Sequence, residues 1–242
     1  MGGVVRAAIG DAILTSMWVF SLPFMGVTTS TICSYFAVEP TSLLTLFITI
    51  NVASLFVLAF SVIGASMGGA SFNPSTTVCF YAAGLRKPGD SLLSFAVRFP
   101  AQAAGGVAGA LAILQVMPGK YRHMLRGPTL KVDMHKGAVA EGIISFAFCL
   151  ALLIVMLKGP RMFLFKVWLL AVATVGLVIA GRDYTGPSMN PANAYGWAYV
   201  NNWHNSWDLF YVYWFGPFIG AALAAWVFKL MFKPPQVKQK EA

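Results

Sequence analysis

Charged residues are scarce in this sequence. Only 10% of the 242 residues are Asp, Glu, Lys or Arg, whereas 58% are hydrophobic, and the mean hydropathy is +0.71. A soluble globule of this length needs more polar surface than these residues supply. The composition therefore excludes an ordinary soluble domain and indicates a protein whose solvent is largely lipid.

Cysteine and histidine are also rare, with three residues of each. They are dispersed along the chain: Cys33, Cys79, Cys149, His123, His135 and His204. There is no Cys-x-x-Cys pair, and no cluster has the spacing of a metal site. Nothing in the sequence pairs a nucleophile with a base. We therefore expect no metal, no cofactor and no enzymatic activity.

Basic residues outnumber acidic ones, 17 against 8, which gives a formal net charge of +9. A basic chain often binds nucleic acid, but these lysines and arginines stand at the ends of apolar segments and form no basic face interleaved with aromatic residues. We interpret them as the flanks of membrane-spanning helices and expect no nucleic-acid partner.

Six apolar segments are long enough to cross a hydrocarbon core, which takes about 20 helical residues. They are predicted at residues 8–33, 43–67, 92–117, 137–157, 165–180 and 209–232. A cleavable signal peptide is the alternative for the first, but its apolar stretch is too long and its start carries only Arg6 before Asp11. The sequence thus predicts an all-α protein embedded in the lipid bilayer.

The basic residues also predict an orientation. Sorted by alternating connections, one side of the membrane receives Arg6, Arg86, Lys87, Arg98, Lys158, Arg161, Lys166, Lys229, Lys233, Lys238 and Lys240. The other side receives Lys120, Arg122, Arg126, Lys131, Lys136 and Arg182. Because the side richer in Lys and Arg is the cytosolic one, both termini are predicted to be cytosolic.

Three sequence markers occur twice, in the same order. They pair residues 6–11 with 136–141, residues 69–75 with 186–192, and residues 102–105 with 217–220. This self-similarity divides the chain into halves at about residues 1–118 and 119–242. Each half holds three crossings, an odd number, so the second half enters the membrane from the opposite side. The repeat is therefore inverted, and the chain is one membrane domain.

Each half also contains an apolar segment too short to span the membrane, at residues 72–84 and 189–201. Both open with Asn-Pro, which suits a helix start because Asn caps free N–H groups and Pro fits the first position. One Asn-Pro is an ordinary turn signal, but two in matching places of an inverted repeat are strong evidence. We expect the two half-helix N-termini to meet near the midplane, with Asn73 facing Asn190 across a central passage.

Two acids, Asp11 and Glu141, lie inside predicted membrane helices, where they are costly without partners. We interpret them as acceptors for the backbone N–H groups of the irregular loops that precede the half-helices. The alternative is proton-coupled transport with these carboxylates as relays. The structural role is favoured because the acids recur symmetrically and no intramembrane Lys or His completes a relay.

Taken together, these features resemble the major intrinsic proteins, the aquaporin family, over essentially the whole chain. The resemblance is carried by Asn73-Pro74-Ser75 and Asn190-Pro191-Ala192, by the early acid of each half, and by Asp183-Tyr184-Thr185-Gly186. The short N-terminus, the high pI and Ser75 in place of the usual Ala make the chain most similar to the plant small basic intrinsic proteins. The resemblance implies six helices plus two half-helices, one pore per subunit, and a homotetramer.

The resemblance also implies a second constriction near the non-cytosolic mouth. Family members usually have an Arg directly after the second motif, where this chain has Asn193. The other expected wall residues are Pro187, Val178 where many water channels carry His, and Val52 or its neighbour Ala53 from the second crossing. The familiar cationic filter is thus missing, which leaves strict water selectivity open.

We therefore expect a passive channel for water. The alternatives are a less selective channel for hydrogen peroxide, ammonia or small polyols, a secondary transporter, and a purely structural membrane protein. The tail at residues 233–242 carries Lys238 and Lys240 at the third and fifth places from the C-terminus. This spacing resembles the dilysine signal that returns membrane proteins to the endoplasmic reticulum, which is the location expected here.

Overall fold

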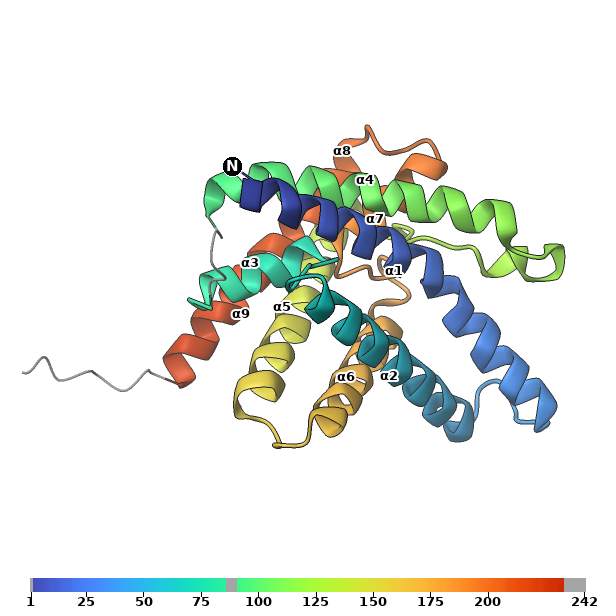
Figure 1. Cartoon of the computed structure of the whole chain (residues 1–242). Coiled ribbons are helices and arrows are strands. Elements are labelled where there is room, and N and C mark those ends of the chain that lie inside the picture. The colour runs from blue at the N-terminus through green and yellow to red at the C-terminus, as the bar shows by residue number, and fades with distance from the viewer. Residues whose placement is uncertain (1, 86–90, 233–242) are drawn as a thin grey trace, which may run out of the picture.

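The computed structural model describes residues 2–85 and 91–232, and within these ranges the chain is helical without strands (Figure 1). The elements are α1 (Gly2–Tyr35), α2 (Leu43–Ser66), α3 (Pro74–Ala82), α4 (Leu92–Val116), η1 (Gly119–Met124), α5 (Met134–Lys158), α6 (Phe163–Gly181), α7 (Pro191–Val200), α8 (Trp207–Phe210), η2 (Tyr211–Phe215) and α9 (Gly216–Met231).

Among the described residues, six helical segments are long and apolar enough to cross a membrane. They are Gly3–Tyr35, Leu43–Ser66, Leu92–Val116, Met134–Lys158, Phe163–Gly181 and Trp207–Met231. Each corresponds to one predicted crossing, so the predicted fold class is confirmed. The first helix begins several residues earlier than expected, because nothing before Ala8 interrupts a helical backbone. The chain is a multi-pass membrane protein.

The short helices α3 and α7 begin at the two Asn-Pro pairs. Asn73 and Asn190 are their N-caps, each with extended backbone at φ −142°, and a proline is the first helical residue in both. The helices contain 9 and 10 residues. At about 1.5 Å rise per residue they reach only about half-way through the hydrocarbon core.

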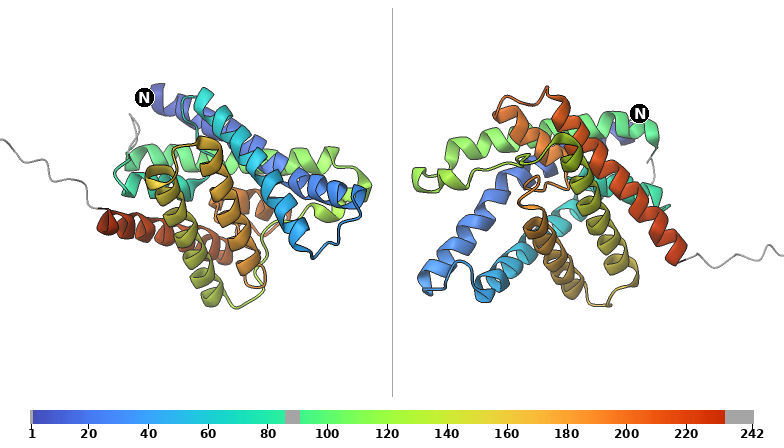
Figure 2. Two further views of the ribbon diagram at one scale, coloured as in Figure 1. Left: turned by 90° about the horizontal axis from the view of Figure 1, so that it is seen from below. Right: turned by 180° about the vertical axis from the view of Figure 1, so that it is seen from behind.

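Glycines let the long helices pack closely in pairs, α1 against α4 and α5 against α9 (Figure 2). A Cβ added at Gly105 in α4 would lie 2.2 Å from the carbonyl oxygen of Ala12 in α1. A Cβ added at Gly220 in α9 would lie 2.2 Å from the carbonyl oxygen of Gly142 in α5. These contacts are too short for any side chain, so the glycines set the spacing of both pairs.

The sixth crossing is not a continuous α-helix. It passes from α8 through one π-helical turn, η2, into α9. Pro217, at the start of α9, has no N–H to donate to the carbonyl of Tyr213 four residues earlier, which interrupts the regular ladder. The buried Tyr213 hydroxyl instead donates to the carbonyl oxygen of Thr185 at 2.8 Å, so this turn contacts the loop that leads to α7.

The loop before α3 is held by a buried ion pair. Asp11 of α1 is 0% exposed, and its Oδ1 accepts from the backbone N–H of Ser71 at 2.8 Å. Arg98 of α4 donates from Nε to Oδ2 at 2.7 Å and from Nη2 to Oδ1 at 3.1 Å. The Gln102 side chain donates to Oδ2 at 2.8 Å. The carboxylate thus joins α1, α4 and the loop.

The burial of Arg98 corrects the charge sorting. Arg98 was assigned to the ends of apolar segments on the cytosolic side, but it lies inside α4 and is only 4% exposed. Its partner Asp11 is 87 positions away in sequence, so spacing along the chain gives no sign of the pair. An intramembrane cation therefore does accompany one of the two acids.

Glu141 of α5 has the corresponding place beneath the loop before α7. It is 0% exposed and accepts from the backbone N–H groups of Ser188 at 2.9 Å and Met189 at 3.2 Å. The Thr185 hydroxyl donates to it at 3.0 Å. These three donors are all neutral, so the two acids hold equivalent loops with different partners.

We predict that Arg98→Met destabilises the fold by about 3–5 kcal/mol, because it leaves the Asp11 carboxylate buried without its cation. The double variant Asp11→Asn with Arg98→Met should regain much of this stability, since Asn is neutral. Thermal unfolding of purified protein in detergent measures both, with Arg122→Met on the exposed connection as the control. A single variant as stable as the parent would contradict the prediction.

Candidate functional site

The two Asn-Pro motifs lie against each other in the interior. The Asn73 side-chain amide donates from Nδ2 to the carbonyl oxygen of Met189 at 3.0 Å. The Asn190 amide donates in the same way to the carbonyl oxygen of Phe72 at 2.9 Å. Both asparagines are buried, at 6% and 5% exposed. The structure therefore brings together two segments that are more than 110 positions apart in sequence.

The side-chain oxygen of each asparagine caps the half-helix that follows it. Asn73 Oδ1 accepts from the backbone N–H of Ser75 at 2.9 Å, and Asn190 Oδ1 accepts from Ala192 at 3.1 Å and Asn193 at 3.3 Å. Each asparagine thus caps its own half-helix with its oxygen and contacts the opposite loop with its nitrogen. Because α3 and α7 both begin here, their partial positive charges of about half a unit each are directed at the same place.

The loops that deliver the asparagines have special backbone conformations. Gly69 and Gly186, at corresponding places, have φ of +78° and +51°, which favours glycine. Met189, directly before Asn190, also has φ of +51°, although it is not glycine. Such strain costs on the order of 1–3 kcal/mol and persists only where surrounding contacts impose it. Met189 is bonded on both sides, through its N–H to Glu141 and through its carbonyl to Asn73.

Ser75, the residue that departs from the usual motif, is 0% exposed at the start of α3. Its Oγ has no hydrogen-bond partner among the described residues. Ala192 holds the matching place in α7 and is also fully buried. The prolines Pro74 and Pro191 are buried beside them.

An aromatic group supports the first loop. Phe72 stacks on Trp18 of α1 with ring centroids 4.3 Å apart, and Phe60 of α2 meets Trp18 edge-on at 5.0 Å. These side chains hold the carbonyl of Phe72 where Asn190 reaches it. Aromatic residues are common throughout this sequence, so the pattern alone did not single these out.

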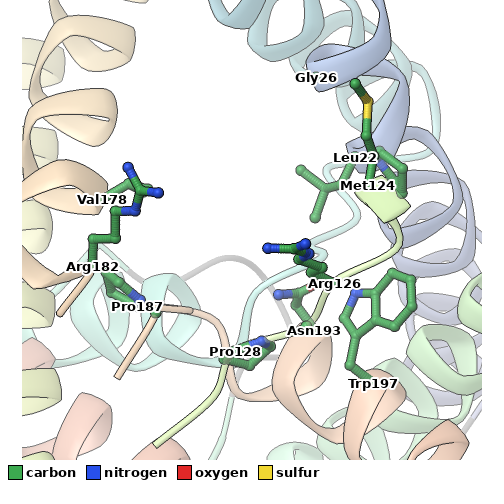
Figure 3. A pocket seen from close by; sticks show the side chains of 13 residues that line it. Leu22, Gly26, Met124, Arg126, Pro128, Val178, Arg182, Pro187, Asn193 and Trp197 are labelled. Atoms are coloured by element: carbon green, nitrogen blue, oxygen red, sulfur yellow. The ribbon is translucent and has the colours of Figure 1, made fainter. Parts of the chain in front are cut away.

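A cavity of about 310 Å³ opens beside the start of α7 (Figure 3). Its walls come from α1, the α4–α5 connection, α6 with the loop after it, and α7: Leu22, Pro23, Gly26, Met124, Arg126, Gly127, Pro128, Val178, Arg182, Gly186, Pro187, Asn193 and Trp197. Three of the four expected filter residues, Val178, Pro187 and Asn193, are among them. Val52 is not: it is buried in α2 at 5% exposed, and α1 supplies the wall instead.

Two arginines in this wall were not singled out from the sequence. Arg126 and Arg182 extend toward the cavity from opposite sides (Figure 3). Arg126 lies on the connection between α4 and α5, and its Nε donates to the carbonyl oxygen of His123 at 2.9 Å. The sequence showed only that this connection is rich in basic residues. It gave no sign that one of them reaches the cavity.

A second cavity, of about 470 Å³, lies between α1 and α2 and shares Gly26 with the first. Its polar wall groups are hydroxyls and one thiol, from Thr29, Ser30, Cys33, Ser34, Thr45 and Thr49. The described residues contain no group of three or more His, Cys, Asp or Glu side chains placed to hold a metal ion. The polar groups of this second cavity are all uncharged.

Comparison with known proteins agrees with this architecture. The family model described as "Major intrinsic protein" matches residues 3–228. The chain is 50% identical to "Aquaporin SIP1-2" of Zea mays over 100% of this chain and 99% of that protein. It is 46% identical to "Aquaporin SIP1-1" of Arabidopsis thaliana over 100% of this chain and 98% of the relative.

A solved structure shares the fold at low sequence identity. The aquaglyceroporin from Plasmodium falciparum superimposes with a TM-score of 0.66 at 18% identity, covering 93% of this chain and 95% of that one. The full-length relatives are named as channels, and they carry the small basic intrinsic protein designation. The chain therefore belongs to the major intrinsic protein family, as an aquaporin-family channel of the small basic intrinsic type.

Proposed function

We propose that this channel conducts water passively, driven by an osmotic or solute gradient. The observation that carries the proposal is the meeting of Asn73 and Asn190 at the facing starts of α3 and α7. The N-termini of the two half-helices face each other within the membrane, and amide donors lie at their junction. This arrangement forms a site for the oxygen of a small neutral solute.

The amides supply the donors. Each Asn side chain has two N–H groups, and one of each is used in the bond to the opposite loop. The second is left for the oxygen of a passing water molecule. A water that accepts from both asparagines directs its own hydrogens outward and relays no proton through the centre. The positive ends of both half-helices oppose the entry of cations at the same point.

A less selective channel is the second candidate. It is favoured by the wall of the cavity beside α7. Asn193 and Val178 in its wall are smaller than the Arg and His expected in a strict water filter. Hydrogen peroxide, ammonia and small polyols are the solutes to test. Solute flux that saturates and follows an ion gradient would instead favour a secondary transporter.

We also propose the arrangement of the whole chain in its membrane. Residues 1–118 and 119–242 act as inverted halves, which is supported by the paired contacts of Asp11 with Ser71 and of Glu141 with Ser188. Both termini face the cytosol, and four copies form a tetramer. Large exposed apolar side chains on α9, at Ile219, Leu223, Trp226 and Leu230, suit contact with lipid or a neighbouring subunit. Enzymatic activity is not part of this proposal.

Replacing both Asn73 and Asn190 by Asp or by Leu should abolish conduction. Asp is the sharper change, because it retains the capping oxygen while it removes both N–H donors and adds negative charge. Stopped-flow shrinkage of proteoliposomes, run with several osmolytes, measures the effect, and gel filtration checks that the oligomer is retained. Unchanged permeability in a correctly inserted double variant would remove the central-constriction model.

Asn193→Arg should narrow selectivity toward water, because a fixed guanidinium adds charge and donors to the cavity wall. The expected result is slower uptake of peroxide and polyols relative to water. Asn193→Gln enlarges the side chain without charge and serves as the control. If the Arg variant passes these solutes as readily as the parent does, Asn193 does not line the filter.

The endoplasmic reticulum is the proposed location, and the proposed signal is Lys238 with Lys240, which lie outside the described residues. We predict that the chain with a free C-terminus stays in that membrane, whereas Lys238→Ser with Lys240→Ser lets part of the population reach the Golgi or the cell surface. Fluorescence imaging requires the tag at the N-terminus, since a C-terminal tag masks such a signal. Full retention of the double variant in the endoplasmic reticulum would show that Lys238 and Lys240 are not the retention signal.

A further inference from the structure

We propose that Arg126 supplies the cation of the outer constriction, in place of the residue that follows the Asn190-Pro191-Ala192 motif. The inference rests on the proposed channel function and concerns which solutes enter. Arg126 lines the same cavity as Asn193, although it comes from the α4–α5 connection and Asn193 from α7 (Figure 3). A guanidinium is therefore present at the cavity even though the motif lacks one.

The position of Arg126 is restrained at both its backbone and its side chain. The backbone N–H donates to the carbonyl oxygen of Met124 at 3.0 Å, and the side-chain Nε donates to the carbonyl oxygen of His123 at 2.9 Å. The Nε bond uses one of the five N–H donors of the guanidinium. The remaining donors stay available to a solute that has an acceptor oxygen.

The positive charge at the cavity is not neutralised by a neighbouring acid. Within residues 2–85 and 91–232, neither Arg126 nor Arg182 forms an ion pair. Lys131 adds a third cation close by, since its Nζ donates to the carbonyl oxygen of Arg182 at 3.0 Å. Asp183 directly follows Arg182 in the sequence, but its side chain is exposed and forms no ion pair with either arginine. A cleft lined by charge of one sign concentrates its field on the entering solute.

Asn193 lines the same cavity and carries no charge. Asn193 is 9% exposed, its Nδ2 donates to the Ser188 hydroxyl at 3.1 Å, and its Oδ1 is buried without a partner among the described residues. The guanidinium donors therefore suit small neutral solutes with an acceptor oxygen, and the positive charge opposes cations such as methylammonium.

The charge can be measured without any flux. Val178 lines the cavity and is 42% exposed, whereas the three native cysteines are buried, so Val178→Cys places one accessible thiol there. Its reaction rates with a negatively and a positively charged methanethiosulfonate reagent report the local potential. In protein reconstituted into nanodiscs at low salt, adding Arg126→Gln should lower the negative-to-positive rate ratio by at least about threefold. The chain without Val178→Cys gives the background rate.

Matched variants separate this charge from the general charge of the connection. Arg122→Gln removes an exposed cation from the same connection that does not line the cavity, and it should leave the rate ratio unchanged. Arg126→Lys keeps the charge and should retain most of the ratio. Equal ratios in the Arg126→Gln and Arg122→Gln proteins would overturn the proposal. A thiol at residue 178 that does not react would also overturn it, because the cavity would then be closed to solute.

Flux in proteoliposomes gives the second readout. Arg126→Gln should raise methylammonium uptake relative to water permeability several-fold, and Asn193→Arg added to it should lower uptake again by restoring a guanidinium to the same cavity. An unchanged uptake ratio in Arg126→Gln counts against the proposal. A parent protein that passes no solute would refute the channel function alone, since the thiol rate ratio still decides whether Arg126 sets the potential.

Discussion

Two non-helical loops at membrane depth impose the constraint on which the rest of the structure depends. Backbone N–H groups in a bilayer must find acceptors inside the protein. Asp11 and Glu141 provide them, at 2.8 Å to Ser71 and at 2.9 Å to Ser188. Because these loops bring Asn73 and Asn190 each against the opposite loop, the two acids help to position the starts of the half-helices. This explains why costly carboxylates occur within otherwise apolar helices.

Asp11 and Glu141 each hold one of the two loops, but their other hydrogen-bond partners differ in charge. Asp11 is paired with Arg98 and also accepts from Gln102, whereas Glu141 accepts from Thr185 and backbone N–H groups, all of which are neutral. Pro217 stands where the second half would match Gln102, and it carries no side-chain donor. The likeness between the two acids therefore extends to their backbone contacts and not to their charged partners. A substitution of Asp11 therefore removes different contacts from a substitution of Glu141.

The cavity beside α7 has positively charged residues in its wall, although the residue after the second Asn-Pro motif and its alanine is neutral. The residue after the Asn190-Pro191-Ala192 motif is Asn193, yet Arg126 and Arg182 line the same space from other segments. A guanidinium acts through its field and its donors, and both depend on where it lies, not on which segment carries it. Wall residues from α1 likewise take the place expected for Val52 of α2.

Local patterns were sufficient to predict much of this protein. Hydropathy predicts the six crossings, and Asn-Pro predicts the starts of α3 and α7, because helix length and capping depend on neighbouring residues. The paired acids were interpreted from the repeat alone. Tertiary structure decided the rest: Arg98 reaches Asp11 across 87 positions, Met189 adopts positive φ, and Arg126 reaches the cavity. Each of these depends on contacts between segments distant in the chain, which no local pattern records.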